Sequence, residues 1–278
     1  MTRAEALKKL SARLPAHEAR ALLAGVLKEA PALFFARLRE PLPEAAWEEA
    51  LRLAERRARG EPLQLLLGFT EFFGLALRPA PGVLIPRPET EGLVERALRF
   101  LEGRPTPVVL DVGAGTGAIA LAIKARRPDA RVFASDISAA ALELAQRNAR
   151  QLGLEVAFIH APLTAGLTGL DLVVANPPYL PENDRETAPP ELGFEPETAL
   201  FSGEEGLDVA RPLAEEALRA LKPGGGLLLE LDPRNVFLLA ARLPRLGYRD
   251  VGVGFDLSGR PRYLFGRRPG TAAAEAAG

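Results

Sequence analysis

One short motif in the sequence carries side chains that can do chemistry, the tetrapeptide Asn176-Pro177-Pro178-Tyr179. Its asparagine offers a side-chain carbonyl oxygen as a hydrogen-bond acceptor. The two prolines fix the backbone, and because proline has no N–H, the carbonyl groups there meet less competition from neighbouring donors. The tyrosine offers a flat face. A proline turn that simply ends a strand is the plainer interpretation of these four residues.

These groups suit a planar amino group, such as an amide or an exocyclic NH2. The Asn176 side-chain oxygen and the Pro177 carbonyl can accept its two hydrogens, while Pro178 and Tyr179 cover its plane. Both hydrogen bonds strengthen as the nitrogen attacks an electrophile and gains positive charge. The motif therefore predicts group transfer to a weakly nucleophilic nitrogen. Asn176, Pro177 and Tyr179 are the predicted catalytic residues, and all four residues are predicted to bind the substrate.

A glycine-rich loop follows an earlier apolar segment, and a carboxylate follows the next one. Glycines let the backbone turn sharply and approach a ligand at the N-terminus of a helix. Asp136 lies 23 residues after the first glycine, a spacing that lets a carboxylate accept hydrogen bonds from both ribose hydroxyls. The pattern predicts a nucleoside cofactor, although a dinucleotide or a tight turn without a ligand also fits it. The loop residues are Gly113, Ala114, Gly115, Thr116 and Gly117.

The elements that must position these motifs begin at about residue 90, where short apolar segments alternate with helical ones. PVVLDV, ARVFASD, LEVAFIH and LDLVVAN are typical of buried strands, and residues 118–127 and 138–153 are typical of helices. This alternation predicts an α/β fold with a doubly wound parallel sheet. Both motifs then lie at the carboxyl edge of the sheet, where such folds bind ligands.

The end of this domain distinguishes between variants of the doubly wound fold. A helix over about 206–221 precedes a fifth strand, GGGLLLELD, and the segments YRDVGVGFD and RYLFGRR are joined only by a short SGRP turn. They predict an antiparallel hairpin at the sheet edge. Such a hairpin favours the methyltransferase variant of the fold over the dinucleotide-binding one.

The first 75 residues predict a separate helical domain. Thr2 and Glu5 match a capping box, and prolines stand just before two further helical patterns. Residues 62–80 contain glycines between β-prone segments and predict a linker hairpin. We therefore expect a helical domain over 1–75 and a catalytic domain over 76–278, with a disordered Ala-rich tail at 270–278.

Composition excludes several classes of site. The chain has 278 residues, 47% of them hydrophobic, no cysteine and two histidines, with a net charge of −1. A disulfide framework, a thiolate nucleophile and a histidine metal centre are therefore excluded, and no metal is predicted. The near-zero charge argues against a direct nucleic-acid partner. No apolar segment approaches the roughly 18 residues that span a bilayer, and no signal peptide is visible, so we expect a cytoplasmic protein without a membrane partner.

Taken together, the motifs resemble those of the HemK/PrmC family, the release factor glutamine methyltransferases. Besides DVGAGTGAIALA and NPPY, the chain carries LIPRPETE at 84–91, FEPETALFSGEEGLD at 194–208 and a closing SGRPRYLFGR. The resemblance implies a class I S-adenosylmethionine-dependent methyltransferase fold. It also implies S-adenosylmethionine as the donor and class I peptide chain release factors as the partner. The acceptor would be the glutamine of their Gly-Gly-Gln motif, methylated at N5 of its side-chain amide.

The resemblance also implies roles for individual residues. The loop from Gly113 to Gly117 would hold the methionine part and ribose of the cofactor, Asp136 the ribose hydroxyls, and Asn176 the substrate amide beside the cofactor. Arg87, Pro88 and Glu89 would shape the pocket rim or make a structural salt bridge. The N-terminal domain is expected to dock the release factor.

Two segments depart from the family pattern. After LEVAFIH, members usually have an acidic residue and then an aromatic or aliphatic one that meets the adenine, whereas this chain has His160-Ala161-Pro162-Leu163. We place Pro162 near the base, and the adenine amino group must be recognised elsewhere. His160 is a candidate general base, although a histidine that merely ends a strand is the plainer interpretation. After the fifth strand, members of the family commonly continue with Gly and Gln. This chain has Leu231-Asp232-Pro233-Arg234 there.

Three other functions stay open at this point. An amino-group methyltransferase acting on adenine or guanine in nucleic acid is the main alternative, because the same tetrapeptide suits a flipped base. A non-catalytic binding module would not need an intact Asn176. A nicotinamide dehydrogenase would need a catalytic acid that the sequence does not show at a matching place.

Overall fold

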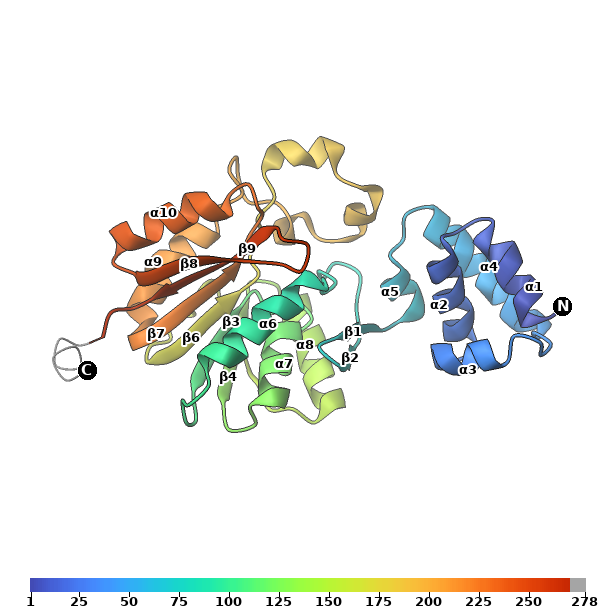
Figure 1. Cartoon of the computed structure of the whole chain (residues 1–278), viewed down its shortest axis with the longest axis horizontal. Coiled ribbons are helices and arrows are strands. Elements are labelled where there is room, and N and C mark those ends of the chain that lie inside the picture. The colour runs from blue at the N-terminus through green and yellow to red at the C-terminus, as the bar shows by residue number, and fades with distance from the viewer. Residues whose placement is uncertain (271–278) are drawn as a thin grey trace. The chain divides into compact units, whose positions relative to one another are not determined.

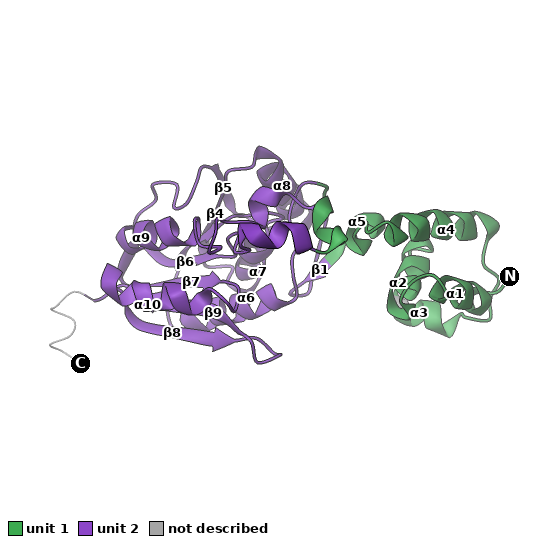
Figure 2. Ribbon diagram, turned by 90° about the horizontal axis from the view of Figure 1, so that it is seen from above, with its two compact units in different colours: residues 1–70, 79–81, 189–194 green, residues 71–78, 82–188, 195–278 purple. Residues whose placement is uncertain are grey.

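The computed structural model describes residues 1–270 (Figure 1), and the chain divides into two compact units (Figure 2). Each unit has a hydrophobic core of its own. The tail that we expect to be disordered, 270–278, lies outside the described residues except for Gly270. Unit 1 comprises residues 1–70, 79–81 and 189–194, and unit 2 comprises 71–78, 82–188 and the residues from 195 onward.

Unit 1 is built from short helices around a small apolar core. The capping box predicted at its start is confirmed, because the Glu5 N–H donates to the Thr2 hydroxyl and the Thr2 N–H donates to the Glu5 carboxylate. Leu10, Leu22 and Phe34 are fully buried in its core. The helices are α1 (Arg3–Ser11), α2 (Ala16–Val26), α3 (Pro31–Ala36), α4 (Glu44–Ala58) and α5 (Leu63–Leu67).

The linker hairpin is shorter than the sequence predicts. Strands β1 (Thr70–Phe72) and β2 (Leu75–Leu77) pair with each other, so the predicted hairpin over 62–80 is confined to 70–77. Residues 63–67 form α5 instead. Their run of leucines has no β-branched residue, leucine favours helices, and Gly68 ends the helix in the left-handed conformation at φ 74°.

Unit 2 is organised around a seven-stranded sheet with the order β5-β4-β3-β6-β7-β9-β8. The first five strands in that order are parallel, and β9 runs antiparallel to both β7 and β8. The predicted doubly wound sheet with a terminal antiparallel hairpin is confirmed. The strands are β3 (Val108–Val112), β4 (Arg131–Asp136), β5 (Ala157–His160), β6 (Leu170–Ala175), β7 (Leu221–Glu230), β8 (Arg249–Phe255) and β9 (Pro261–Arg267).

Helices cover both faces of this sheet (Figure 1). On one face lie α6 (Glu89–Phe100), α7 (Ala118–Arg126) and α8 (Ala139–Leu152), and on the other lie α9 (Ala210–Ala220) and α10 (Val236–Leu246). The sequence pattern predicts α7, α8 and α9 but indicates no helix at α6 or α10. Between β6 and α9 the chain makes three 3-10 helices, η1 (Glu182–Thr187), η2 (Pro190–Phe194) and η3 (Glu197–Ala199).

Strand alternation decides which side chains meet which helices. Val174 and Leu228 pack on the α6–α8 face, whereas Ala175 and Leu229 pack on the α9–α10 face. The next residue of each strand therefore returns to the α6–α8 face. Because β3, β4 and β6 are parallel, the glycine loop, Asp136 and the tetrapeptide all lie at the carboxyl ends of their strands, at one edge of the sheet.

Candidate active site

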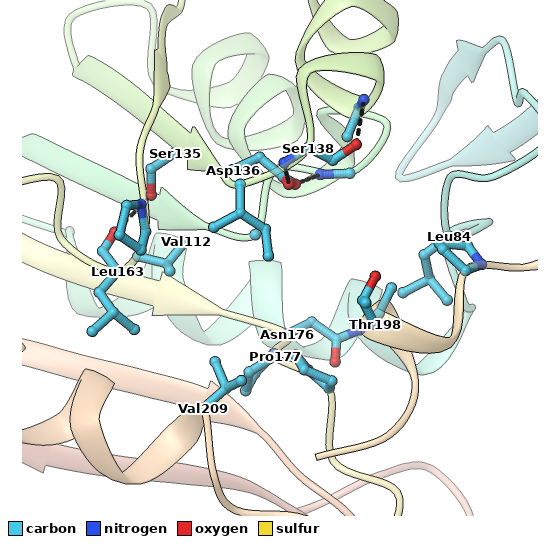
Figure 3. Close-up of a pocket in the computed structure, with 18 of the residues that line it drawn as sticks. Leu84, Val112, Ser135, Asp136, Ser138, Leu163, Asn176, Pro177, Thr198 and Val209 are labelled. Carbon is cyan, nitrogen blue, oxygen red and sulfur yellow. Dashed lines mark hydrogen bonds between the residues drawn. The ribbon is translucent and has the colours of Figure 1, made fainter. Parts of the chain in front are cut away.

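A cavity of about 330 Å³ opens at the carboxyl edge of the sheet (Figure 3). That volume lies within the range of about 300–1,000 Å³ found for small-molecule sites. Its walls come from the segments that follow β3, β4, β5 and β6, together with residues 82–84 and 196–199 and the start of α9. The cavity therefore collects residues from the glycine loop, the end of β4, the tetrapeptide, LIPRPETE and FEPETALFSGEEGLD.

Only some residues of the glycine loop line this cavity. Gly113 and Gly115 line the cavity, whereas Ala114, Thr116 and Gly117 do not. The N–H groups of Gly113 and Ala114 donate to the Ser135 carbonyl at 2.8 and 2.9 Å and so fasten the loop to the end of β4.

The remaining loop residues support its shape. Gly117 has φ 84°, and a Cβ there would lie 3.2 Å from the Ala145 Cβ, so glycine allows α7 and α8 to approach each other. The Thr116 carbonyl accepts a hydrogen bond of 2.9 Å from Asn148. Two loop residues are thus placed to touch a ligand, and three hold the turn in position.

Asp136 presents its carboxylate to the cavity in a fixed orientation. Its two oxygens accept hydrogen bonds from the N–H groups of Gly115, at 2.9 Å, and Ser138, at 2.8 Å (Figure 3). A carboxylate has about four lone-pair positions, so two such bonds leave acceptor capacity for a ligand. Asp136 is therefore already oriented to receive a pair of hydroxyl groups.

Beneath the loop, Asp111 is a buried acid that the sequence analysis did not single out. It is fully buried in β3, and burial raises its pKa to about 8, with the charge of Asp136 adding to the effect. One of its oxygens accepts a 3.0 Å hydrogen bond from the Ala120 N–H in the first turn of α7. Asp111 thereby fixes the start of the helix that follows the loop.

The side chain of Asn176 has only half of its hydrogen bonding satisfied within the protein. Its Nδ2 donates to the Thr90 hydroxyl at 3.2 Å, while its Oδ1 is buried and has no hydrogen-bond partner. A buried polar atom without a partner is uncommon and costs free energy, so it demands an explanation. Since Asn176 also lines the cavity, this oxygen is an acceptor prepared for a donor that enters from the cavity.

The rest of the tetrapeptide divides between the cavity and the core. Pro177 and Pro178 line the cavity, but Tyr179 does not. The Tyr179 ring packs against the apolar core on the α9–α10 face, and burial raises the pKa of its hydroxyl. Its carbonyl accepts a 2.9 Å hydrogen bond from Asn235. The tyrosine in this structure holds the turn rather than covering the cavity.

The segments LIPRPETE and FEPETALFSGEEGLD are joined beside the cavity by the buried carboxylate of Glu195. Glu195 pairs with Arg87 and accepts a 2.8 Å hydrogen bond from the Ile85 N–H. Val83 and Leu84 on one side of this contact, and Pro196 and Thr198 on the other, line the cavity. Arg87 itself does not, so its place matches the structural salt bridge. Glu195 and Thr90 were missed by sequence reasoning, although both lie in the unusual motifs that carry the resemblance.

Replacing Glu195 by alanine is expected to destabilise the protein by about 1–3 kcal/mol, because the Ile85 N–H and Arg87 lose a buried partner. Glu197→Ala is the matched control, since Glu197 is exposed and pairs with the exposed Arg185. It should cost less than about 0.5 kcal/mol. Unfolding in urea measures both, and equal losses would contradict the role given to Glu195.

The segment after β5 forms an apolar wall. Ala161, Pro162 and Leu163 line the cavity, as does Ile137 after β4. His160 does not line it; its Nε2 lies 2.9 Å from the Ile137 carbonyl at the exposed end of β5. Pro162 thus belongs to the cavity wall, whereas His160 has a contact with the backbone outside it.

Residues 1–270 lack two kinds of structural feature. That part of the chain contains no helix long and apolar enough to cross a membrane. It also contains no group of three or more acidic or histidine side chains arranged to hold a metal ion.

Comparisons with known proteins match both units. A family model described as the PrmC N-terminal domain matches residues 3–68, and one described as the methyltransferase small domain matches residues 95–189. The chain is 49% identical over 257 residues to a release factor glutamine methyltransferase of Deinococcus radiodurans, with 92% of each chain covered. It is 42% identical to one of Burkholderia pseudomallei, with 97% of each covered.

A solved structure supports the fold of the chain. The T. thermophilus 16S rRNA N2 G1207 methyltransferase, in complex with AdoMet and guanosine, matches with a TM-score of 0.53 and 21% identity. The match covers 72% of this chain and 49% of that one. At this level of identity, the likeness concerns the fold alone.

Proposed function

The chain belongs to the release factor glutamine methyltransferase family, and we propose that it methylates N5 of the glutamine side chain in the Gly-Gly-Gln motif of class I peptide chain release factors. The donor in this proposal is S-adenosylmethionine. The observation that carries the proposal is the buried, unpaired Oδ1 of Asn176 at the cavity. Because its substrate is a translation factor, the enzyme is proposed to act in the cytoplasm.

The acceptor amide is held by the tetrapeptide. One amide hydrogen of the glutamine donates to Asn176 Oδ1 and the other to the Pro177 carbonyl, so the nitrogen faces the donor with its lone pair. An amide nitrogen is a poor nucleophile because its lone pair is delocalised. As the nitrogen gains positive charge, both hydrogen bonds strengthen, so the site binds the transition state more tightly than the ground state.

No dedicated base is required for this transfer. The amide nitrogen becomes acidic once it carries the methyl group, so its proton can leave to solvent after the transfer. This accords with the position of His160 outside the cavity wall. The work of the site is to orient two reactants, which can contribute about 7–11 kcal/mol in favourable cases.

The cavity also suits the donor. S-adenosylmethionine, when bound, supplies a methyl group on a positively charged sulfur. We assign its ribose hydroxyls to Asp136, whose carboxylate is pre-oriented by two N–H groups, and its base to the apolar wall at Pro162. Gly113 and Gly115 approach the ligand directly, with Asn176 beside it, while Ala114, Thr116 and Gly117 keep the loop in shape.

Methyl transfer from labelled S-adenosylmethionine to a purified release factor tests the proposal. The control is the same factor with alanine in place of the glutamine of its Gly-Gly-Gln motif. We expect label on the native factor and none on the control. Equal labelling of both would move the site to another residue, and labelling of nucleic acid instead would establish the alternative substrate class.

Unit 1 is proposed to dock the release factor, because it has a core of its own and takes no part in the cavity lining. Removing residues 1–68 is expected to raise KM for intact release factor about tenfold or more, the loss expected when a cluster of interface residues disappears. KM for a short Gly-Gly-Gln peptide and the affinity for S-adenosylmethionine should stay unchanged. Unaltered KM for the intact factor would place docking elsewhere.

A further inference from the structure

Glu230 is a buried acid for which the reaction described above has no use. It is the last residue of β7, none of its surface is exposed, and neither carboxylate oxygen has a hydrogen-bond partner in the structure. The nearest charged group that forms an ion pair with it is Arg262, whose Nη1 lies 3.8 Å from Oε1. A buried carboxyl group with so few partners is costly, so its presence calls for a role in the structures that adjoin it.

The sheet places Glu230 beside Asn176. Ala175 of β6 pairs with Leu229 of β7, so Asn176 and Glu230 are the next neighbours along the two parallel strands. Strand alternation turns both side chains toward the α6–α8 face. Thr90, which is buried in the first turn of α6, accepts the hydrogen bond from Asn176, and its hydroxyl lies close enough to Glu230 to lower the pKa of that carboxyl group.

The first turn of α6 is itself fixed against the sheet. The Tyr263 hydroxyl of β9 donates a 2.6 Å hydrogen bond to the Glu89 carbonyl, and Tyr263 pairs with Glu230 across the strands. A Cβ at Gly92 would collide with that hydroxyl, so glycine is what lets α6 approach β9. Thr90 is therefore held where its hydroxyl can meet both Asn176 and Glu230.

A threonine hydroxyl has one hydrogen to give and two lone pairs. If that hydrogen goes to Glu230, only lone pairs remain for Asn176, so the asparagine must turn its Nδ2 toward Thr90 and its Oδ1 toward the cavity. If Glu230 is instead protonated and donates to Thr90, the hydroxyl is free to donate to Asn176 Oδ1. Asn176 would then offer a donor to the cavity, which cannot hold the hydrogens of an amide.

We propose that Glu230 is a positioning residue that acts through Thr90 to keep Asn176 Oδ1 directed at the substrate amide. The unit Glu230–Thr90–Asn176 is named the acceptor relay below. This inference rests on the proposed role of Asn176. It makes the carboxylate form of Glu230 the active one and gives the buried acid a function that no contact with substrate provides.

The surroundings of Glu230 give it a pKa in the pH range where the enzyme is expected to work, so its protonation should affect activity. Burial raises the pKa of Glu230 to about 7, while the Thr90 hydroxyl and Arg262 oppose that rise. Because the active form is the carboxylate, kcat/KM should fall as the pH drops through about 7. The other charged or titratable groups around it are Glu89 of α6, Asp256 of the β8–β9 turn, Tyr179 after β6 and Tyr263 of β9.

The test is the pH dependence of release factor methylation by the full chain and three variants. For the wild type, kcat/KM should fall about tenfold per pH unit below about pH 7. Glu230→Gln should lose this pH dependence, because glutamine cannot ionise. Thr90→Val should lower kcat by about tenfold or more, and Thr90→Ser, which keeps the hydroxyl, should restore it. Affinity for S-adenosylmethionine should be unchanged in all of them.

The outcomes separate the acceptor relay from the proposed function. All proteins use the same release factor, so a titration in the substrate would affect every profile alike. Persistence of the acid limb in Glu230→Gln overturns the proposal, and so does a wild-type kcat in Thr90→Val. If Asn176→Ala is inactive while Thr90→Val is fully active, only the relay fails. If Asn176→Ala is itself active, the role proposed for Asn176 fails first.

Discussion

Asn176→Ala is expected to lower kcat for methyl transfer by about 10²–10³-fold or more, the loss typical when one preorganised group that stabilises the transition state is removed. The variant loses the unpaired Oδ1 that we assign to the substrate amide. It keeps Asp136 and the glycine loop, so its affinity for S-adenosylmethionine should stay close to that of the wild type. Single-turnover methylation and calorimetric binding measure the two effects separately.

Asn183→Ala provides the matched control for this substitution. Asn183 lies in η1, a few residues beyond the tetrapeptide, and its side chain is exposed. The same change there should leave kcat and cofactor affinity unaltered. A wild-type kcat in Asn176→Ala would refute the amide-holding role, whereas a joint loss of activity and cofactor binding would show that Asn176 serves mainly the donor.

Asp136→Ala is expected to produce the opposite pattern, a loss of S-adenosylmethionine affinity of at least about a hundredfold. A hydrogen bond to a charged group contributes about 1.5–3 kcal/mol, and a carboxylate that binds two ribose hydroxyls makes two of them. The substitution also frees the N–H groups of Gly115 and Ser138, which now donate to Asp136. Titration of the variant with S-adenosylmethionine measures the change in Kd.

Asp129→Ala is the control for the aspartate. Asp129 precedes β4, whereas Asp136 ends it, so the two carboxylates stand at opposite edges of the sheet. Asp129 pairs with the neighbouring Arg127 and should not affect ligand affinity. An Asp136→Ala variant that binds S-adenosylmethionine as tightly as the wild type would remove Asp136 from the donor site.

The strands and loops that position the site are predictable from the sequence because they depend on local patterns. Apolar runs separated by helical stretches predict parallel strands, and parallel strands bring their following loops to one edge. The sequence therefore predicts that the glycine loop, Asp136 and Asn176 belong to one site. The structure places Gly113, Gly115, Asp136 and Asn176 on one cavity.

The rest of the site depends on contacts between distant segments. Thr90 and Glu230 are ordinary residue types 140 positions apart, and only the register of β6 and β7 and the approach of α6 bring them to Asn176. Glu195 is similar, because its partners Ile85 and Arg87 are more than 100 residues away. A weak signal existed for Glu230, a charged residue at the end of an apolar strand.

Tyr179 lies in a different place from the one that its motif predicts. Its spacing after Asn176 suggests a wall for the substrate, but the chain turns at the two prolines. The ring then packs into the α9–α10 side of the core, and Asn235 holds the Tyr179 carbonyl. Helix α10, which follows Asn235, was not predicted, so the partner that fixes the tyrosine could not be foreseen.

The central claim is that Asn176 Oδ1 receives a hydrogen of the substrate amide. A crystal structure of the chain with S-adenosylhomocysteine and a Gly-Gly-Gln peptide tests it most directly. We expect the glutamine amide nitrogen about 2.9 Å from Asn176 Oδ1, with Thr90 still bonded to Nδ2. A glutamine amide held by other groups, with Asn176 turned away from it, would contradict the claim.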